Sequence, residues 1–236
     1  MEIFDIHSHV LPGVDDGAKD MEMTERILDT LYEQGVRTVF ATPHFSIRSR
    51  EDKAERVARA YNKVNNYLNE KYSDMQILLG SEVYMEEGMV ERIKDEKVFT
   101  MNKTPYVLCE FQFGGRYKDM YRYLQQLVRA RYKPVIAHVE RYSCLQGEWS
   151  LIHELREMGV LMQINAESLS GNMFDKRYRY GKTLIQAEVI DFIGSDAHDM
   201  KQRAPMLDKA ERTMVKLIGK EKAECILNKN AQVFLK

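Results

Sequence analysis

The sequence has little of what marks several protein classes. It carries three cysteines in 236 residues, and they show no spacing typical of a zinc module or a disulfide framework. No apolar run approaches the roughly 18 residues that a membrane-spanning helix needs, and no basic-then-apolar leader opens the chain. We therefore expect a cytoplasmic protein that does not insert into a membrane.

An excess of charge of one sign is also missing. The chain has 35 Lys and Arg against 36 Asp and Glu, which gives a formal net charge of −1. Such a balance provides no field that gathers polyanions, so we expect no nucleic-acid partner. Neither a low-complexity tract nor a Gly/Ser linker divides the sequence, and its length is sufficient to bury one sizeable core. Residues 1–236 are therefore expected to form a single domain.

Short runs rich in β-branched and aromatic residues alternate with segments of helical period. The runs are Ile3–Val10, Thr38–His44, Gln76–Val83, Tyr106–Phe113, Pro134–Val139, Val160–Ala166 and Val189–Gly194. Apolar residues between them share helix faces, as in Val57, Val64 and Leu68 and again in Met120, Leu124 and Leu127. This alternation predicts an α/β fold with a mostly parallel sheet, which could be open and doubly wound or closed into a barrel.

The position of the reactive side chains favours the barrel. In nearly every run they stand at the carboxyl end: His7 and His9, His44, Glu82, Glu110, His138, then Asp196 and His198. The carboxyl ends of barrel strands converge on one face, whereas an open sheet would spread them along a crevice. We therefore predict a βα barrel of about seven strands.

Histidines and acids recur at a two-residue spacing. Asp5, His7 and His9 stand at i, i+2 and i+4, so on an extended strand all three point to the same face. Asp196 and His198 repeat this spacing near the end of the chain. The pattern is typical of metal ligands.

Two carboxylates support a metal site. Glu82 and Glu110 each end an apolar run, where an unpartnered carboxylate would carry a heavy desolvation penalty. Nitrogen and oxygen ligands without a thiolate suit Mn²⁺, Fe or Zn²⁺ better than Mg²⁺. Because the candidate donors are too many for one ion, we expect two or three metals that share carboxylates.

The motifs together resemble the polymerase-and-histidinol-phosphatase (PHP) superfamily. They are Asp-Ile-His-Ser-His at 5–9, Val-Asp-Asp-Gly at 14–17, Ala-Thr-Pro-His at 41–44, Gly-Ser-Glu at 80–82, Glu110, Ala-His-Val-Glu-Arg at 137–141 and Ser-Asp-Ala-His at 195–198. Within the superfamily the chain is most similar to the bacterial tyrosine-protein phosphatases of the capsule and exopolysaccharide type, the CpsB/CapC family. The likeness covers essentially the whole chain.

The resemblance implies three divalent metal ions, expected to be Mn²⁺ with Fe or Zn²⁺ as alternatives, on a distorted seven-stranded βα (TIM-like) barrel. The implied ligands are His7, His9, Glu82 and Asp196 for one ion, Glu82, Glu110 and His138 for a second, and Asp16, His44 and His198 for the third. Asp16 aligns with the family ligand, although the residues alone leave Asp15 open. Asp5 is expected to orient a ligating histidine.

The implied reaction is hydrolysis of a phosphate monoester by a metal-bridging hydroxide. The resemblance assigns Arg141 and Arg203 to phosphate, and a guanidinium fork suits two phosphate oxygens. A phenol leaves with little help from a general acid, which fits phosphotyrosine, and the sequence offers no convincing acid. A cysteine phosphatase is excluded, because none of the three cysteines has an arginine six positions later.

The resulting hypothesis is a metal-dependent protein-tyrosine phosphatase that acts on the phosphotyrosine tail of a bacterial tyrosine kinase and so regulates capsule or exopolysaccharide synthesis. The first alternative is a small-molecule phosphatase such as histidinol-phosphatase. A phosphodiesterase or exonuclease is disfavoured by the balanced charge, and a non-catalytic regulator that binds its kinase is a further alternative. Met/Tyr-rich helices would permit a homo-oligomer.

Overall fold

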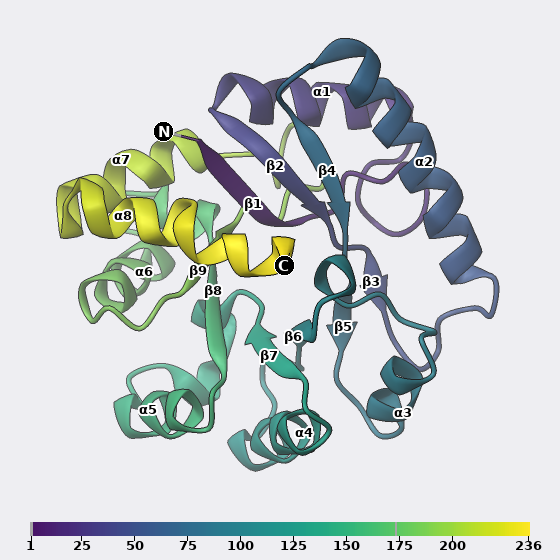
Figure 1. Ribbon diagram of the computed structural model, residues 1–236. Coiled ribbons are helices and arrows are strands. Elements are labelled where there is room, and N and C mark those ends of the chain that lie inside the picture. Colours follow the sequence, from purple (N-terminus) through teal and green to yellow (C-terminus); the bar gives the residue numbers. More distant parts are fainter. Residues whose placement is uncertain (1, 173) are drawn as a thin grey trace.

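The computed structural model describes residues 2–172 and 174–236, which form a curled parallel sheet with helices on its outer side (Figure 1). The strands are β1 Ile3–Ser8, β2 Val36–Ala41, β3 His44–Phe45, β4 Gln76–Leu79, β5 Glu82–Tyr84, β6 Tyr106–Glu110, β7 Lys133–Ile136, β8 Leu161–Asn165 and β9 Phe192–Gly194. The helices are α1 Met21–Glu33, α2 Lys53–Lys71, α3 Met89–Lys94, α4 Tyr117–Arg129, α5 Trp149–Glu157, α6 Lys176–Gln186, α7 Leu207–Ile218 and α8 Lys220–Leu227.

The strands follow one another around a barrel-like wall. Their order is β1-β2-β4 in one sheet and β3-β5-β6-β7-β8-β9 in the other, and these pairings are parallel. β2 and β4 run on into β3 and β5, which joins the two sheets. Ser8 at the end of β1 pairs with Ala197 beyond β9. The predicted α/β fold with a mostly parallel, barrel-like sheet is confirmed, and the sheet is curled into a half-barrel.

Two of the predicted strands are each broken into two short ones. Thr38–His44 divides into β2 and β3, and Gln76–Val83 divides into β4 and β5. Pro43 cannot donate a ladder hydrogen bond, which accounts for the first break. At the second break a Cβ on Gly80 would lie 2.7 Å from Met101 Sδ, so glycine permits this close approach. After both breaks, His44 and Glu82 pair as neighbours in the next sheet.

The predicted helix faces are confirmed. Val57, Val64 and Leu68 are buried on α2, and Met120, Leu124 and Leu127 are buried on α4. None of the helices in residues 2–172 and 174–236 combines the length and the apolar character that crossing a membrane would require.

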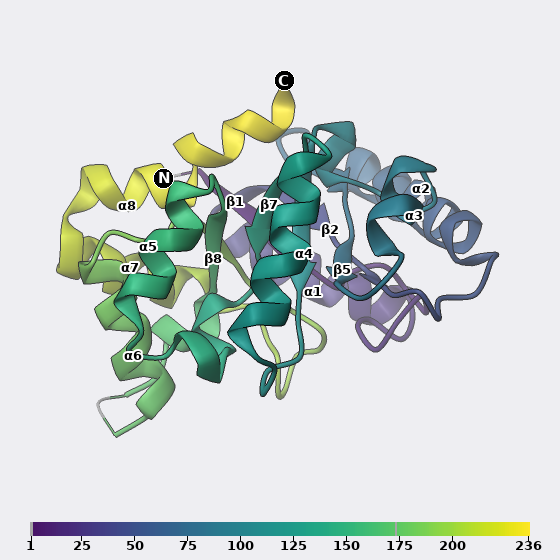
Figure 2. The ribbon, with the colours of Figure 1, turned by 90° about the horizontal axis from the view of Figure 1, so that it is seen from below.

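Apolar side chains fill the inside of the barrel toward the amino ends of the strands. This cluster includes Phe4, Ile6, Phe40, Leu108, Val135 and Phe192. The C-terminal segment Lys229–Leu235 crosses this end of the barrel and buries Phe234 there, on the side away from the loops that follow the strands (Figures 1 and 2). This inner apolar cluster thus occupies one end of the barrel, and the carboxyl end is left to carry polar groups, while a larger apolar cluster includes the buried faces of the helices.

Candidate active site

The structure brings all nine predicted ligand residues together at the carboxyl ends of the strands. They come from β1 and the loop after it, from β3, β5 and β6, and from the segments after β7 and β9: His7, His9, Asp16, His44, Glu82, Glu110, His138, Asp196 and His198. Most are buried, whereas the Asp16 side chain is 65% exposed. Within the described residues, three overlapping groups of these side chains have ligand atoms that lie within 4.8 Å of one another.

The first group is His7, His9, Glu82 and Asp196. The Nε2 atoms of His7 and His9 lie 3.2 Å apart, and each lies 3.2 Å from Glu82 Oε2. Each Nε2 is also 3.5 Å from Asp196 Oδ1. Two imidazoles and two carboxylates therefore converge on one buried point.

The second group is His9, Asp16, His44 and His198. Asp16 Oδ1 lies 3.3 Å from His44 Nε2 and 3.6 Å from His198 Nε2. The His9 ring lies between the others, with centroid distances of 3.9 Å to His198 and 4.5 Å to His44. This group forms the more exposed edge of the site.

The third group is His44, Glu82 and Glu110. His44 Nδ1 lies 3.0 Å from Glu82 Oε2 and 3.6 Å from Glu110 Oε2. His138 approaches from the other side, with Nε2 2.7 Å from Glu82 Oε1 and 3.9 Å from Glu110 Oε1. Glu82 is therefore the carboxylate around which the site is assembled.

Backbone geometry shapes these positions. A Cβ on Gly194 would lie 2.5 Å from the Cβ of His7, and one on Gly17 would lie 2.2 Å from the carbonyl oxygen of His9. Glycine at both positions lets neighbouring backbone close around the two histidines. His138 and Asp196 have φ values of 35° and 53°, a region that costs strain in residues other than glycine. Strain of this kind often accompanies a functional site.

Contacts within the cluster shift its pKa values. Burial alone would lower the pKa of His9, but Asp15 and Glu82 outweigh it and raise that pKa to about 9. For His44, hydrogen bonds to Asp16 and Glu82 similarly overcome burial and raise the pKa to about 11. Burial, together with the charge of Glu82, raises the pKa of Glu110 to about 7. The cluster therefore attracts positive charge strongly.

The donor set fits divalent cations. Glu82 Oε2 is buried and makes no hydrogen bond to any described residue, although nitrogens of His7, His9 and His44 lie within 3.2 Å of it. His198 Nε2 is another buried atom without such a bond in the described part of the chain. Lone pairs that converge in this way are satisfied by a metal ion, and nitrogen with carboxylate oxygen suits Mn²⁺, Fe or Zn²⁺.

Asp15 and Asp16, left open by the residues alone, occupy different places. Asp16 lies against His44 and His198, as described above. Asp15 Oδ2 lies 2.8 Å from His9 Nδ1 and accepts a hydrogen bond from the His44 backbone N–H. Asp15 therefore orients His9 through its Nδ1 atom, and Asp16 faces the centre of the second group.

Asp5 does not join His7 and His9 at the cluster, contrary to the same-face expectation. Its carboxylate accepts hydrogen bonds from the Ser195 backbone N–H and hydroxyl at 2.8 and 2.6 Å. It also accepts from the backbone N–H of His7 and not from the imidazole. The pairing of β1 with β2 shifts register between Asp5 and Ser8, which interrupts the simple alternation. Asp5 thus ties β1 to the segment after β9.

Two residues of β8 also support the cluster, and the sequence reasoning missed them. Gln163 Oε1 lies 3.2 Å from His7 Nδ1 and accepts a 2.7 Å hydrogen bond from the His138 backbone N–H. Asn165 donates a 2.7 Å hydrogen bond to Asp196 Oδ2. Their only sequence signal is the two-residue spacing that places both on the inner face of the strand.

The two predicted arginines lie at the rim of the cluster, on opposite oxygens of one carboxylate. Arg203 Nη2 lies 2.6 Å from Asp196 Oδ1, and Arg141 Nη1 lies 3.7 Å from Asp196 Oδ2. The Arg141 side chain is 32% exposed and the Arg203 side chain 33%. Both guanidinium groups can therefore reach a ligand at the mouth.

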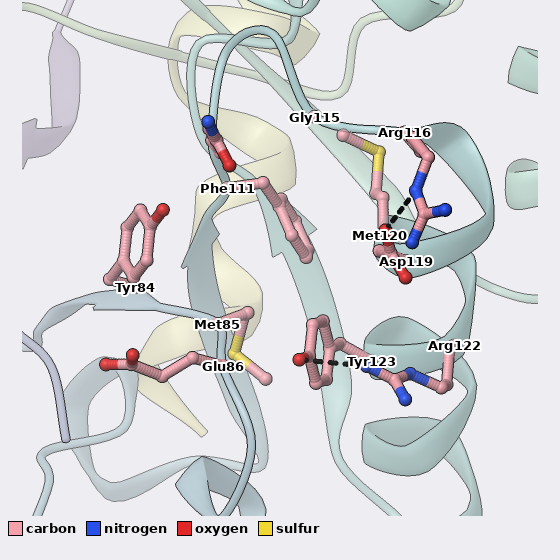
Figure 3. Close-up of a pocket in the computed structure, with 11 residues that line it drawn as sticks. Tyr84, Met85, Glu86, Phe111, Gly115, Arg116, Asp119, Met120, Arg122 and Tyr123 are labelled. Carbon is pink, nitrogen blue, oxygen red and sulfur yellow. Dashed lines mark hydrogen bonds and ion pairs between the residues drawn. The ribbon is translucent and has the colours of Figure 1, made fainter.

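A pocket of about 400 Å³ lies beside the cluster, between the end of β5 and α4. Figure 3 shows Tyr84 and Met85 on one side of it and Tyr123 of α4 on the other, with Phe111 between them. Met85 donates its backbone N–H to the carbonyl of Glu110, which places the pocket directly next to the site.

The cysteines stay outside this chemistry. Cys109 is buried, and burial raises the pKa of its thiol. Cys144 and Cys225 are partly buried and make no disulfide within the described residues. These environments agree with the exclusion of a cysteine phosphatase.

Comparison with known proteins decides the family. Residues 3–236 match the family described as capsular polysaccharide synthesis, CpsB/CapC. The chain belongs to the CpsB/CapC family. It is 31% identical to the tyrosine-protein phosphatase CpsB of Streptococcus agalactiae, over 99% of this chain and 98% of that protein. It is 32% identical to the tyrosine-protein phosphatase YwqE of Bacillus subtilis, over 99% and 92%.

Solved structures agree with this membership. A solved structure from the pair YwqE of Bacillus subtilis and CpsB of Streptococcus pneumoniae, described as metal-dependent tyrosine phosphatases, matches this chain with a TM-score of 0.90 at 30% identity. The match covers 99% of this chain and 94% of that chain. A histidinol phosphate phosphatase from Lactococcus lactis matches with a TM-score of 0.57 at 15% identity, covering 91% and 92%. The second likeness shows a shared fold.

Proposed function

We propose that this CpsB/CapC family member is a metal-dependent protein-tyrosine phosphatase whose substrate is a phosphotyrosine tail of a bacterial tyrosine kinase in capsule or exopolysaccharide synthesis. The observation that carries the proposal is the set of three overlapping His and carboxylate groups, two of which contain Glu82. Relatives that cover nearly the whole chain are tyrosine-protein phosphatases, which supports the same activity.

In this proposal the site would hold three divalent ions, Mn²⁺ by expectation. His7, His9, Glu82 and Asp196 would hold one, Glu82, Glu110 and His138 a second, and Asp16, His44 and His198 the third. This division differs from the three groups above, because His138 takes the place of His44 beside Glu82 and Glu110, and His9 is assigned to one ion only. The 2.7 Å between His138 Nε2 and Glu82 Oε1 and the orphaned Glu82 Oε2 support it. Divalent ions held there supply Lewis-acid chemistry and water whose pKa is lowered toward neutrality.

The side chains of this protein then position the substrate. Arg141 and Arg203 each present a guanidinium group at the rim, which suits the equatorial oxygens of a phosphate monoester. Both contact Asp196, so their heads are held beside the cluster. The phenol of tyrosine has a pKa of about 10, so it can leave without protonation by a strong general acid. This agrees with the sequence, which offers no convincing general acid. The pocket beside Glu110 adds surface for residues that flank a phosphotyrosine.

The test is phosphate release from three substrates at equal concentration by the Mn²⁺-reconstituted protein. A phosphotyrosine peptide, the matching phosphoserine peptide and histidinol phosphate separate the candidates. We expect preference for phosphotyrosine and its loss with a chelator. Preference for histidinol phosphate would retain the metal site and favour the small-molecule alternative, and turnover that survives complete metal removal would contradict the proposed mechanism.

A further inference from the structure

Phe113 is a large apolar side chain left 36% exposed at the mouth of the site. It lies in the loop between β6 and α4, three residues after Glu110. A single exposed apolar side chain is ordinary by itself, so its meaning depends on what the ring contacts.

Three site residues surround the ring. The His138 ring meets it in a T-shaped contact at a centroid distance of 5.5 Å, and the Tyr142 ring lies 5.7 Å away. Arg141 places its guanidinium carbon 4.2 Å from the ring centroid, a cation–π distance. Phe113 is therefore fixed against a predicted metal ligand and a predicted phosphate-binding arginine, with part of the ring still open to solvent.

This arrangement limits where the rest of a substrate can lie. A phosphate bound by Arg141 is joined to its leaving group through one ester oxygen, so the leaving group begins one P–O bond from the phosphorus that the arginine holds. The exposed part of Phe113 adjoins the same guanidinium. A phenyl leaving group can therefore make an offset or edge-to-face contact with Phe113, and a short alkyl group cannot.

We propose that Phe113 is a specificity-determining residue that selects aryl phosphates by contacting the aromatic ring of the leaving group. The inference rests on the proposed phosphatase function and adds a residue to it. Phe113 takes no part in bond cleavage. Its contact with the substrate ring discriminates phosphotyrosine from phosphate esters of aliphatic alcohols.

The experiment measures binding and turnover on the Mn²⁺-loaded protein. Calorimetry gives the dissociation constants of phenylphosphonate and methylphosphonate, which differ in the ring and cannot be hydrolysed. Phe113→Leu removes the ring and keeps an apolar side chain, whereas Phe113→Tyr keeps the ring. Phe174→Leu is the matched control, since Phe174 is 94% exposed in the loop before α6.

We expect Phe113→Leu to reduce the preference for phenylphosphonate over methylphosphonate by roughly three- to tenfold, the usual size of an aromatic-pair contribution. The same variant should lose a similar factor in kcat/KM on the phosphotyrosine peptide. Phe113→Tyr should retain the preference, and Phe174→Leu should leave it unchanged. Methylphosphonate affinity should stay constant throughout, which separates a ring contact from a displaced Arg141.

Two outcomes overturn the inference. One is an unchanged phenyl-to-methyl preference in Phe113→Leu. The other is an equal loss of affinity for both phosphonates, which would reduce Phe113 to a support for Arg141 and His138. Failure of the proposed function is distinguishable, because the wild-type protein would then not hydrolyse the phosphotyrosine peptide at all.

Discussion

The two ends of the barrel are built from the same strands and bury opposite kinds of side chain. At the amino end the ring of Phe234 packs against Phe40, Tyr106 and Phe192, with centroid distances of 5.4, 5.1 and 5.0 Å. At the carboxyl end imidazoles and carboxylates face one another with nitrogen and oxygen atoms about as close as hydrogen-bonded atoms. One end gains free energy from apolar burial, whereas the other confines like and unlike charges away from water.

This difference indicates that the amino end of the barrel contributes mainly to stability and that the carboxyl end carries the reactive groups. The C-terminal segment closes the apolar end, and Asn102 donates a 2.8 Å hydrogen bond to the Phe234 carbonyl to hold it there. The polar end gains its order from strands that are already fixed below it. Substitutions at the two ends should therefore have separable effects, and four predictions test that separation.

The largest expected effect is the loss of activity in Glu110→Gln. The substitution removes a carboxylate from the proposed ligand set, and we expect kcat/KM on a phosphotyrosine peptide to fall by at least about a thousandfold. Burial raises the pKa of Glu110 to about 7, so ionised Glu110 destabilises the metal-free wild type at pH 8. The free energy of unfolding of the metal-free Glu110→Gln variant at pH 8 should therefore equal or exceed that of the metal-free wild type. Activity and urea denaturation are both measured.

Glu87→Gln is the matched control, because it makes the same change on a side chain that is 79% exposed. It should change neither quantity. Full activity in Glu110→Gln would contradict the prediction, and so would easier unfolding than the wild type when both are metal-free. Either result would show that activity and stability are not divided between the two ends as described.

The second prediction concerns the apolar end. Phe234→Ala should lower the free energy of unfolding by about 3–5 kcal/mol, because a fully buried ring leaves a cavity among other rings. At a temperature where the variant is folded, Mn²⁺ affinity and kcat should stay near the wild-type values. Urea denaturation and calorimetry measure the two. Leu235→Ala, at a position 46% exposed, serves as control, and a large drop in metal affinity with Phe234→Ala would show that the ends are coupled.

Much of this architecture can be predicted from the sequence, since strand runs and helix periods depend on local pattern. The meeting of His7, Glu82 and His138 follows as well, because the carboxyl ends of parallel strands converge whatever the details of the loops. Local pattern is therefore a good guide to which residues share the site.

Other features depend on contacts that no local pattern encodes. Asp15 and Asp16 are chemically equal neighbours, and only the turn at Gly17 sends one behind His9 and the other to the centre. The Asp5 side chain does not lie on the predicted face, because the register of the β1–β2 pairing shifts next to it. Gln163 lies among ordinary strand residues, and its role appears only when β8 pairs with β7 and β9 and its side chain lies 3.2 Å from His7 of β1.

The third prediction tests how far support around the cluster matters. In Asp15→Asn an N–H₂ group replaces one of two carboxylate oxygens, of which Oδ2 contacts His9 Nδ1 and accepts from the His44 backbone N–H, and Oδ1 accepts from the Gly17 backbone N–H. The orientation of His9 is weakened, so Mn²⁺ affinity should fall by about ten- to a hundredfold with little change in unfolding free energy. Calorimetric titration measures the affinity. Asp95→Asn, on an exposed residue after α3, is the control, and an unaltered affinity in Asp15→Asn would assign that residue no supporting role.

The smallest expected effect is the pH dependence of stability in the metal-free protein. The pKa of His9 is raised from 6.5 to about 9, so the folded protein holds this proton more tightly than the unfolded chain. The resulting stability is fully present below pH 6.5 and is lost as the pH rises toward 9. His44 acts in the same direction. Between pH 7 and 8 we expect a loss on the order of 1 kcal/mol for a histidine that stays protonated, measured by urea denaturation with a chelator present.

With saturating Mn²⁺ the unfolding free energy should increase, and not decrease, between pH 7 and 8. Imidazole ligands must lose their protons to bind a metal, so metal affinity, and with it the stability of the loaded protein, should increase over the same pH range. Phenylalanine carries no titratable group, so Phe234→Ala should show the same pH slope as the wild type on a lower baseline. Metal-free stability that rises from pH 7 to 8 would contradict the charge balance described for the cluster, and a changed slope in Phe234→Ala would show that the two ends do not titrate independently.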